Sequence, residues 1–381
     1  MIQVVTKWSN AIYYLEGIDM KKRLLGMMTA AAMTAAMVLS GCSGSQTAAT
    51  TAAPAGGETK TEAATEAKTE AAKTEAAKAE EKKELLVVGF SQVGAESDWR
   101  TANTESMKST FTEKNGYKLI FDDAQQKQEN QLKAVRNFIQ QDVDYIVIAP
   151  VTETGWDTVL QEAKDAGIPV IIVDRMIDVS DDTLYTAWVG SNFLQEGYDA
   201  VKWLDEYLTK NNRTDDAINI VTLQGTIGSS AQIGRTDGVE EKMKDHPKWK
   251  MLERQTGEFT QAKGQEVMES FLKTYNDIDV VIAENDNMAF GAIDAIKAAG
   301  KTCGPKGDIT IISFDAVAAA FDSMIAGDMN VSVECNPLHG PRVSEIIQKL
   351  EKKEKVDKIA YVQEGVYPAD TAATEKPKRA Y

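Results

Sequence analysis

Polar side chains follow three short apolar runs of the sequence, at 170–173, 280–283 and 309–314. These side chains are Asp174 with Arg175, Asn285, and Asp315. A carboxylate accepts a hydrogen bond from a hydroxyl group, while guanidinium and amide N–H groups donate to a hydroxyl oxygen. Charge-assisted bonds of this kind are about twice as strong as neutral ones, and the planar arginine fork can hold two adjacent oxygens. The residue types therefore favour binding of a small, neutral, hydroxyl-rich ligand.

The segments that position these side chains alternate regularly from residue 85 onward. Val- and Ile-rich runs are separated by longer segments with apolar residues at helical spacing, which is typical of a parallel α/β sheet. We predict strands at 86–90, 117–121, 145–149, 170–173, 185–189, 218–223, 252–258, 280–283, 309–314 and 331–334. Ligands of open parallel sheets bind outside the carboxyl ends of the strands, which is where the polar side chains fall.

The folded part of the chain is too long for a single hydrophobic core. About 300 residues exceed what one core comfortably holds, so we expect two lobes. The small-residue turn at 190–192 and the Asn-Pro pair at 336–337 are the candidate crossings between them. Several crossings together form a hinge, and closure of a hinge around a ligand is a common switching mode.

Several sequence segments resemble the ribose-type periplasmic sugar-binding proteins of ABC importers. They are Val-Gly-Phe-Ser-Gln-Val-Gly at 88–94, Ser-Asp-Trp-Arg at 97–100, the Gln-rich stretch 125–136, Ile-Ala-Pro-Val at 148–151, Asp174-Arg175, and the segments 266–271 and 291–293. The resemblance covers essentially the whole chain after residue 85. It implies the type I periplasmic binding protein fold, in which two Rossmann-like lobes with parallel sheets are joined by a multi-crossing hinge. The N-terminal lobe would comprise 85–191 plus 336–360, and the C-terminal lobe 192–335 plus 361–381.

The resemblance also implies which side chains would contact the sugar. They are Glu96, Ser97, Trp99 and Arg100 in the first loop, the pair Asp174 and Arg175, and Arg235, Phe259, Asn285 and Asp315 in the remaining segments. Trp99 and Phe259 would supply flat apolar surface for the C–H face of a sugar. The sequence departs from the family pattern at Glu284, at Ala316, and at Cys335, where several relatives have a hinge glutamine. These departures leave the identity of the sugar open.

Each of these residues also has a plainer interpretation. The alternatives are a surface turn for Asp174 and Arg175, a solvated helix position for Arg235, a helix N-cap for Asp315, a core position for Phe259, and either cleft or solvent for Glu284. Trp156 and Trp188 are expected in the core or at the rim rather than on the ligand.

By the resemblance, the chain would capture a monosaccharide, a hexofuranose such as galactofuranose or a pentose, by closing its two lobes. It would then deliver the sugar, as a monomer, to the permease of an ABC importer. The alternative is a sugar sensor of the same fold that docks on a membrane sensor kinase.

Composition and motifs exclude other classes of protein. The formal net charge of -16 argues against nucleic-acid binding, which needs clustered Lys and Arg. The loop 225–230 could cradle a phosphate, but it lacks the Walker lysine and the spacing of a nucleophile elbow, so we expect no enzyme. With two histidines and no cysteine-rich spacing, we expect no metal and no cofactor. Cys303 precedes one predicted strand and Cys335 ends the next, so parallel strands would keep both thiols apart and free.

The first part of the chain is typical of an exported lipoprotein. Residues 1–19 are expected to be an upstream extension, with Met20 the true start, and 20–41 a signal peptide whose apolar part is too short to span a membrane comfortably. Its end, Leu-Ser-Gly-Cys at 39–42, resembles a bacterial lipobox, which implies that Cys42 is lipidated and anchors the chain on the extracytoplasmic side of the cell membrane. Residues 42–84 are rich in Ala, Thr, Glu and Lys and are expected to be a disordered tether.

Overall fold

The computed structural model describes residues 84–381. The expected upstream extension, signal peptide and lipidated Cys42, and the tether up to residue 83, lie outside these residues. Two six-stranded sheets with helices on both faces make up the described chain, which confirms the predicted class of two α/β lobes. No helix between residues 84 and 381 has the length and the apolar character needed to cross a membrane.

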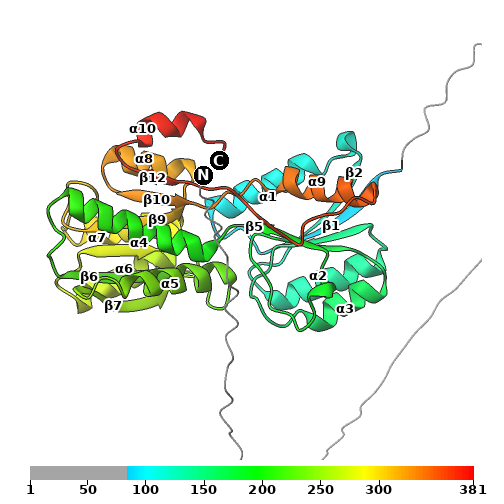
Figure 1. The fold of residues 1–381 in the computed structure, drawn as a ribbon, viewed down its shortest axis with the longest axis horizontal. Helices are drawn as coiled ribbons and strands as arrows, with labels where there is room; N and C mark the ends of the chain where they lie inside the picture. The colour runs from blue at the N-terminus through cyan, green and yellow to red at the C-terminus, as the bar shows by residue number, and fades with distance from the viewer. Residues whose placement is uncertain (1–83) are drawn as a thin grey trace, which may run out of the picture. The chain divides into compact units, whose positions relative to one another are not determined.

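The first sheet is entirely parallel, in the order β11-β5-β4-β3-β1-β2. Its strands are β1 (Leu86–Gln92), β2 (Tyr117–Asp123), β3 (Tyr145–Ile148), β4 (Val170–Val173), β5 (Ala187–Gly190) and β11 (Ile359–Tyr361). Helices α2 (Gln128–Gln140) and α3 (Asp157–Asp165) cover one face, and α1 (Asp98–Thr110) and α9 (His339–Glu351) cover the other (Figure 1). Short 3-10 turns lie at Glu113–Asn115 and Asp182–Leu184. The central strands β3, β4 and β5 are buried throughout because helices lie on both faces of the sheet.

The second sheet has the order β12-β10-β9-β8-β6-β7, and only β12 runs antiparallel to its neighbour. Its strands are β6 (Ile218–Gln224), β7 (Trp249–Thr256), β8 (Val280–Ala283), β9 (Thr310–Asp315), β10 (Val331–Glu334) and β12 (Val366–Pro368). Helices α4 (Phe193–Lys210) and α5 (Ser230–Met243) pack on one face, and α6 (Gln261–Thr274), α7 (Asp286–Ala298) and α8 (Ala318–Ala326) on the other. The short α10 (Ala372–Glu375) lies beside α8 and is followed by a 3-10 turn at Lys376–Lys378.

The chain passes between the two sheets at three places. The first passage joins β5 to α4 at 191–192, the second joins β10 to α9 at 335–338, and the third joins β11 to β12 at 362–365. The lobe bounds implied by the resemblance put a third crossing at 360–361, next to this one, although the three-residue strands on either side of it are only partly buried and have no apolar run.

One local expectation was wrong. The strand expected at 252–258 is β7, which begins at Trp249 and ends at Thr256. It ends there because Glu258 and Phe259 have φ of 53° and 61°, a left-handed conformation that no strand contains. His339 is the first residue of α9 and is fully buried.

The two cysteines are arranged as the sequence suggested. Strands β9 and β10 are parallel, Cys303 precedes β9, and Cys335 directly follows β10. Both residues are buried and free.

Candidate functional site

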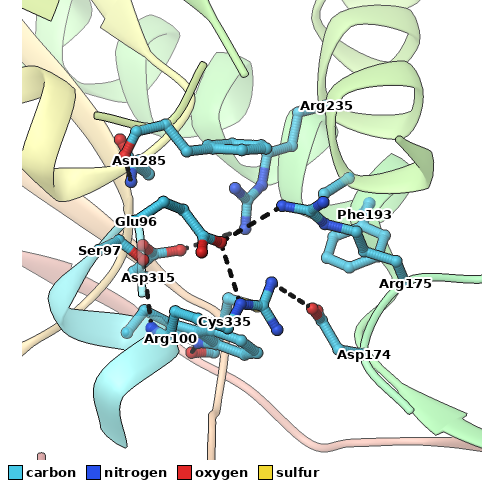
Figure 2. A pocket seen from close by; sticks show the side chains of 13 residues that line it. Glu96, Ser97, Arg100, Asp174, Arg175, Phe193, Arg235, Asn285, Asp315 and Cys335 are labelled. Atoms are coloured by element: carbon cyan, nitrogen blue, oxygen red, sulfur yellow. Dashed lines mark hydrogen bonds and ion pairs between the residues drawn. The ribbon is translucent and has the colours of Figure 1, made fainter. Parts of the chain in front are cut away.

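One cavity at the carboxyl ends of both sheets collects the residues that the sequence singled out. About 280 Å³ between its walls is free of protein atoms, and part of this space is open to solvent (Figure 2). All of the predicted contact residues line it, namely Glu96, Ser97, Trp99, Arg100, Asp174, Arg175, Arg235, Phe259, Asn285 and Asp315. Phe193, Ala231 and Cys335 also line it and were not predicted.

Strand ends and helix starts position these side chains. In the first lobe, Ser97 is the N-cap of α1, and its hydroxyl accepts a hydrogen bond from the backbone N–H of Arg100 (3.1 Å). In the second lobe, Asn285 is the N-cap of α7 and accepts from the N–H of Met288 (2.9 Å). Asp315 is the last residue of β9 and not a cap, because α8 begins only at Ala318. The plainer interpretation of Asp315 as an N-cap is therefore wrong.

Three residues of the cavity wall have a left-handed backbone. The φ angles are 62° at Asp174, 61° at Phe259 and 108° at Asp315. A conformation of this kind costs about 1–3 kcal/mol for a residue other than glycine and persists only where the surrounding structure imposes it. Each of the three lies where the chain leaves a strand, so the sharp change of direction turns its side chain into the cavity instead of along the sheet.

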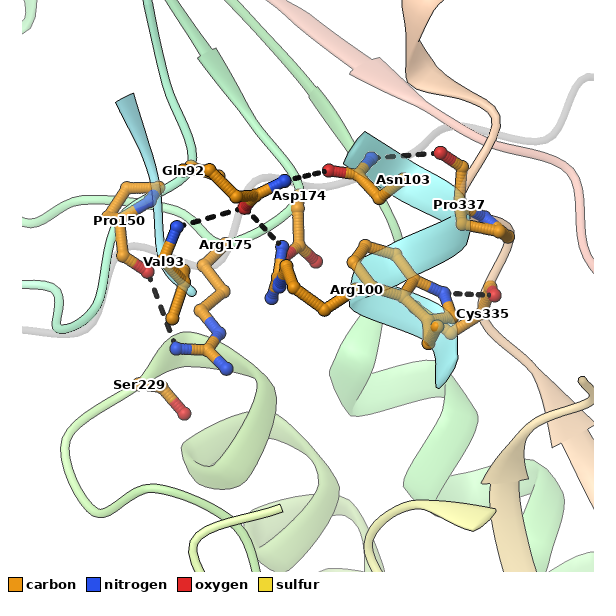
Figure 3. A network of polar contacts seen from close by, with 12 residues as sticks. Gln92, Val93, Arg100, Asn103, Pro150, Asp174, Arg175, Ser229, Cys335 and Pro337 are labelled. Carbon is orange, nitrogen blue, oxygen red and sulfur yellow. Dashed lines mark hydrogen bonds and ion pairs between the residues drawn. The ribbon is translucent and has the colours of Figure 1, made fainter. Parts of the chain in front are cut away.

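Arg100 is the centre of the charged network in the first lobe. Its Nε donates to Glu96 Oε1 (3.0 Å), its Nη2 pairs with Asp174 Oδ2 (2.8 Å), and its Nη1 donates to Gln92 Oε1 (3.2 Å; Figure 3). Arg175 lies 3.7 Å from Glu96 and donates to the backbone oxygen of Val151 (3.0 Å). Both arginines are 2% exposed, so these partners replace water.

Burial and neighbouring charge act together on Arg175. Loss of solvent is the larger effect, the positive charge of Arg100 adds to it, and together they lower the pKa of Arg175 to about 10. The guanidinium therefore remains charged at neutral pH, but it lies in a position where a further oxygen acceptor would be favourable.

Arg235 has the corresponding place in the second lobe. Its Nε donates to Glu196 Oε2 (2.6 Å), its Nη2 lies 3.4 Å from Asp315 Oδ1, and its Nη1 donates to the backbone oxygen of Glu284. Burial raises the pKa of Asp315 well above its usual range, and the charge of Arg235 only partly offsets that rise. The interpretation of Arg235 as a solvated helix residue is wrong, since it is 2% exposed.

One carboxylate oxygen of Glu96 has no hydrogen-bond partner within the described residues. Its Oε1 receives the contacts from both arginines of the first lobe. Its Oε2 is buried and has no hydrogen-bond partner among residues 84–381. Figure 2 shows this carboxylate pointing into the space between Arg100, Arg175 and Arg235. An unpaired buried carboxylate oxygen is unfavourable, so this atom is placed to accept from a ligand.

Aromatic rings form the apolar part of the wall. The guanidinium of Arg100 lies 4.6 Å from the centre of the Trp99 ring, and that of Arg175 lies 5.1 Å from the centre of the Phe259 ring. Trp99 is fixed by a hydrogen bond from its Nε1 to the backbone oxygen of Cys335 (2.6 Å). Phe259 lines the cavity and also packs in the core of the second lobe, so its two interpretations both apply.

The position of the Phe259 ring depends on Gly225. A Cβ atom added to this glycine would overlap the ring of Phe259. Trp156 and Trp188 lie in the core of the first lobe and do not line the cavity.

Direct hydrogen bonds hold the two lobes together around the cavity. The backbone N–H of Asp98 donates to Asn287 Oδ1 (3.0 Å), and the N–H of Met176 donates to Ser230 Oγ (2.8 Å). A third bond joins the N–H of Glu153 to the backbone oxygen of Gly228 (3.0 Å). The structure is therefore a closed form, which agrees with the burial of the charged side chains in the wall.

The cavity residues and partners that were not predicted differ in how visible they are in the sequence. Phe193 follows the first passage between the lobes directly and could have been found from that position. Glu196 lies one turn into α4, and nothing in its surroundings marks it as the partner of Arg235. Cys335 also belongs, with Glu196 and Glu364, to the one group among residues 84–381 whose side chains lie close enough together to share a metal ion.

The sequence left open whether Glu284 faces the cleft or the solvent, and in the structure it faces neither. It is 1% exposed and lies behind the cavity wall, where it accepts from the N–H of Gly225 (2.7 Å) and from the hydroxyl of Thr236 (2.6 Å). Burial raises the pKa of its carboxyl from 4.5 to about 7, although these hydrogen bonds and the charges of Arg235 and Arg254 act in the opposite direction.

A Glu284→Gln variant is expected to change how stability depends on pH. The folded state holds the proton up to about pH 7 and the unfolded state only to about 4.5, so the stabilising contribution is complete below 4.5 and is lost as pH rises through 7. Glutamine does not titrate there, so the variant should gain stability relative to the parent between pH 5 and pH 8, by up to about 3 kcal/mol. Urea unfolding at several pH values measures the difference. Glu105→Gln, on an exposed part of α1, is the control, and a difference that stays constant with pH would contradict the assignment.

Comparison with known proteins places this geometry among binding proteins. Residues 88–339 match the model of a family described as a periplasmic binding protein domain. The chain is similar to the galactofuranose-binding protein of Escherichia coli, with 45% identity over 298 residues, which cover 77% of this chain and 91% of that protein.

Two solved structures are similar in both fold and sequence. One, from Mycobacterium smegmatis in complex with β-D-fucofuranose, has 44% identity and a TM-score of 0.74, covering 78% of this chain and 95% of that one. The other is the binding protein of the arabinose ABC transporter from Shewanella sp. ANA-3, bound to α- and β-L-arabinofuranose. It has 46% identity and a TM-score of 0.73, covering 77% of this chain and 95% of that one.

Proposed function

Because the chain belongs to the periplasmic binding protein domain family, we propose that it captures a monosaccharide in its furanose ring form by closure of its two lobes. The observation that carries this proposal is the buried, unpartnered Oε2 of Glu96, which lies in a closed cavity between three arginines. A sugar hydroxyl donates to such an oxygen and at the same time accepts from a guanidinium, so hydroxyl groups can satisfy both the carboxylate and the arginines.

The charge of the cavity wall supports a neutral ligand. Three arginines are balanced in the wall by the carboxyl groups of Glu96, Asp174 and Asp315. Such a wall offers neither a surplus of positive charge for a phosphate nor a surplus of negative charge for an amine. The furanose ligands of the two similar structures favour the same ring form.

Calorimetric titration tests the ligand class. D-galactose, L-arabinose, D-fucose and D-ribose each interconvert between furanose and pyranose rings in water, and we expect at least one of them to bind. Carbon-13 NMR of the bound, labelled sugar then identifies the ring form, and a furanose spectrum is expected. If none of the four sugars binds, the proposed function is wrong; a bound pyranose would remove the furanose assignment and keep the sugar class.

The proposal also covers the N-terminal part of the chain and the delivery of the sugar. We propose that residues 20–41 are a signal peptide preceded by an upstream extension, that lipidated Cys42 anchors a monomer to the outer side of the cell membrane, and that 42–84 is a tether to the folded lobes. The closed form would present the sugar to the permease of an ABC importer. Mass spectrometry of the mature protein from its native membrane tests the anchor, since a lipid adduct on an N-terminal Cys42 is expected and an unmodified residue would contradict it.

A further inference from the structure

Glu364 connects the three passages between the lobes. It lies in the third passage, at 362–365. Its Oε1 accepts a hydrogen bond from the hydroxyl of Ser191 in the first passage (2.6 Å) and from the backbone N–H of Asn336 in the second (2.6 Å). One carboxylate oxygen therefore fixes all three segments of the hinge, while both of these hydrogen bonds leave Oε2 unused.

Two further ligand atoms lie beside this carboxylate. One carboxylate oxygen of Glu196, the Sγ of Cys335 and one oxygen of Glu364 all lie within 4.8 Å of one another. Glu196 comes from the first turn of α4, just after the first passage, and Cys335 begins the second passage. Cys335 and Glu364 thus lie in the second and third passages, and Glu196 lies four residues after the first.

Glu196 presents an unpartnered atom to this group. Its side chain is 4% exposed, and its Oε2 is held by Arg235 (2.6 Å). Its Oε1 is buried and has no hydrogen-bond partner in the described part of the chain other than the weakly donating thiol of Cys335, which belongs to the same group. A buried carboxylate oxygen with so weak a donor is unfavourable, and a cation placed beside it would remove that penalty. This atom is independent of the sugar cavity, because Glu196 does not line it.

An acidic groove leads to the group from outside. A second cavity of about 630 Å³ is lined by Glu196 and Glu364, and Asp199 and Glu334 lie in the same wall. Glu334 is paired with Arg379 (2.8 Å), and the other three carboxyl groups in this concave surface attract cations. Cys335 lines the sugar cavity instead, so the group separates the two cavities.

We propose that Glu196, Cys335 and Glu364 bind a divalent cation of the zinc type at the hinge. A thiolate with two carboxylates is a ligand set for zinc, whereas calcium and magnesium require oxygen ligands alone. Zinc commonly takes three protein ligands with a water molecule in the fourth position. Outer hydrogen bonds already orient the ligands, from Arg235 to Glu196 and from Ser191 and Asn336 to Glu364. The positive charge of Arg235 is offset by Glu196 and Asp315.

The spacing of these residues explains why the sequence did not suggest a metal. Zinc sites are recognised in sequence from cysteines and histidines a few residues apart. Here the three ligands are separated by more than half of the second lobe and by α9, and only the folding of the hinge brings them together.

Cobalt(II) serves as the spectroscopic probe, with zinc(II) as a competitor. The protein carries Cys42→Ala, so that Cys303 and Cys335 are its remaining thiols. After removal of metal with a chelator and under reducing conditions, we expect one cobalt ion per chain and the ultraviolet charge-transfer band of a cobalt–thiolate bond, which zinc should abolish. The band should disappear in Cys335→Ala, persist in Cys303→Ala, and require at least 10-fold more cobalt in Glu364→Gln.

Several results would overturn the proposal. These are the absence of cobalt binding, binding without the thiolate band, or a band that Cys335→Ala retains. A second measurement needs no variant and therefore does not depend on whether a variant folds. Zinc should slow the alkylation of Cys335 in the unsubstituted chain and leave the alkylation of Cys303 unchanged. Peptide mass spectrometry measures both rates. Equal rates with and without zinc would contradict the site.

Discussion

Replacing Arg100 with alanine is expected to weaken the binding of a furanose sugar by about 100-fold or more. Arg100 joins Glu96 and Asp174 in the first lobe, at 3.0 Å and 2.8 Å, and lies 4.6 Å from the centre of the Trp99 ring. Its loss removes a donor to the sugar and leaves two buried carboxylates without their main counter-charge. A hydrogen bond to a charged group contributes about 1.5–3 kcal/mol, so two such bonds account for the expected factor. Calorimetric titration measures it.

A matched control separates this effect from a general loss of charge. Arg136 on α2 forms an ion pair with Glu162 at 2.8 Å, but both side chains are about 40% exposed and lie away from the cavity. Exposed pairs contribute little, so Arg136→Ala should bind sugar as the parent does. Thermal unfolding of both variants shows whether they are folded. If folded Arg100→Ala kept the affinity of the parent, the cavity would not be the sugar site.

Replacing Gly225 with alanine is expected to lower sugar affinity at least 10-fold without any direct contact between the new methyl group and the sugar. The added Cβ would overlap the ring of Phe259 and force this ring to move. The ring supplies apolar surface to the cavity and lies against Arg175. An aromatic wall of this kind contributes about 0.5–1.5 kcal/mol beyond its buried area, and the displaced ring would also reduce the space for the sugar.

A double-mutant cycle tests this mechanism. Because Gly225→Ala acts through Phe259, adding it to Phe259→Ala should cause little further loss, and the two effects should be far from additive. Additive losses would show that Gly225 acts on something else, such as its hydrogen bond to Glu284. Comparing the double variant with Phe259→Ala also distinguishes a displaced ring from a misfolded lobe. If Gly225→Ala only displaces the ring, the double variant should bind as well as Phe259→Ala.

The sequence predicted the sheets better than the contacts between side chains. Buried strands of a parallel sheet have continuous apolar runs, and the polar residue that ends each run is visible in the sequence, so Asp174, Asn285 and Asp315 could be found. The strand end at Thr256 could not, because the left-handed turn at Phe259 depends on a ring that packs over Gly225. Local pattern carries no information about such a long-range contact.

Buried polar partners were the least predictable part. Glu196 and Glu284 read as ordinary charged residues, yet both are almost completely buried, one against Arg235 and the other against Thr236. Their burial is decided by which helices pack on the second sheet and by the passages between the lobes. A single sequence shows the residue type at such a position, but not the neighbour whose hydrogen bond or charge stabilises the buried side chain.

Helix α9 has a consequence for the order in which the chain can fold. It packs against α1, more than 220 residues earlier in the sequence, and the backbone of Gly340 lies so close to that of Ser106 that any larger residue would collide. Strand β11 likewise completes the first sheet only near the end of the chain. The face of the first sheet that α1 and α9 cover therefore cannot be fully buried until almost all of the protein has been synthesised, and such long-range closure is slow. For an exported protein this delay is useful, because a nascent chain whose first lobe stays incomplete remains unfolded enough to be threaded through a membrane.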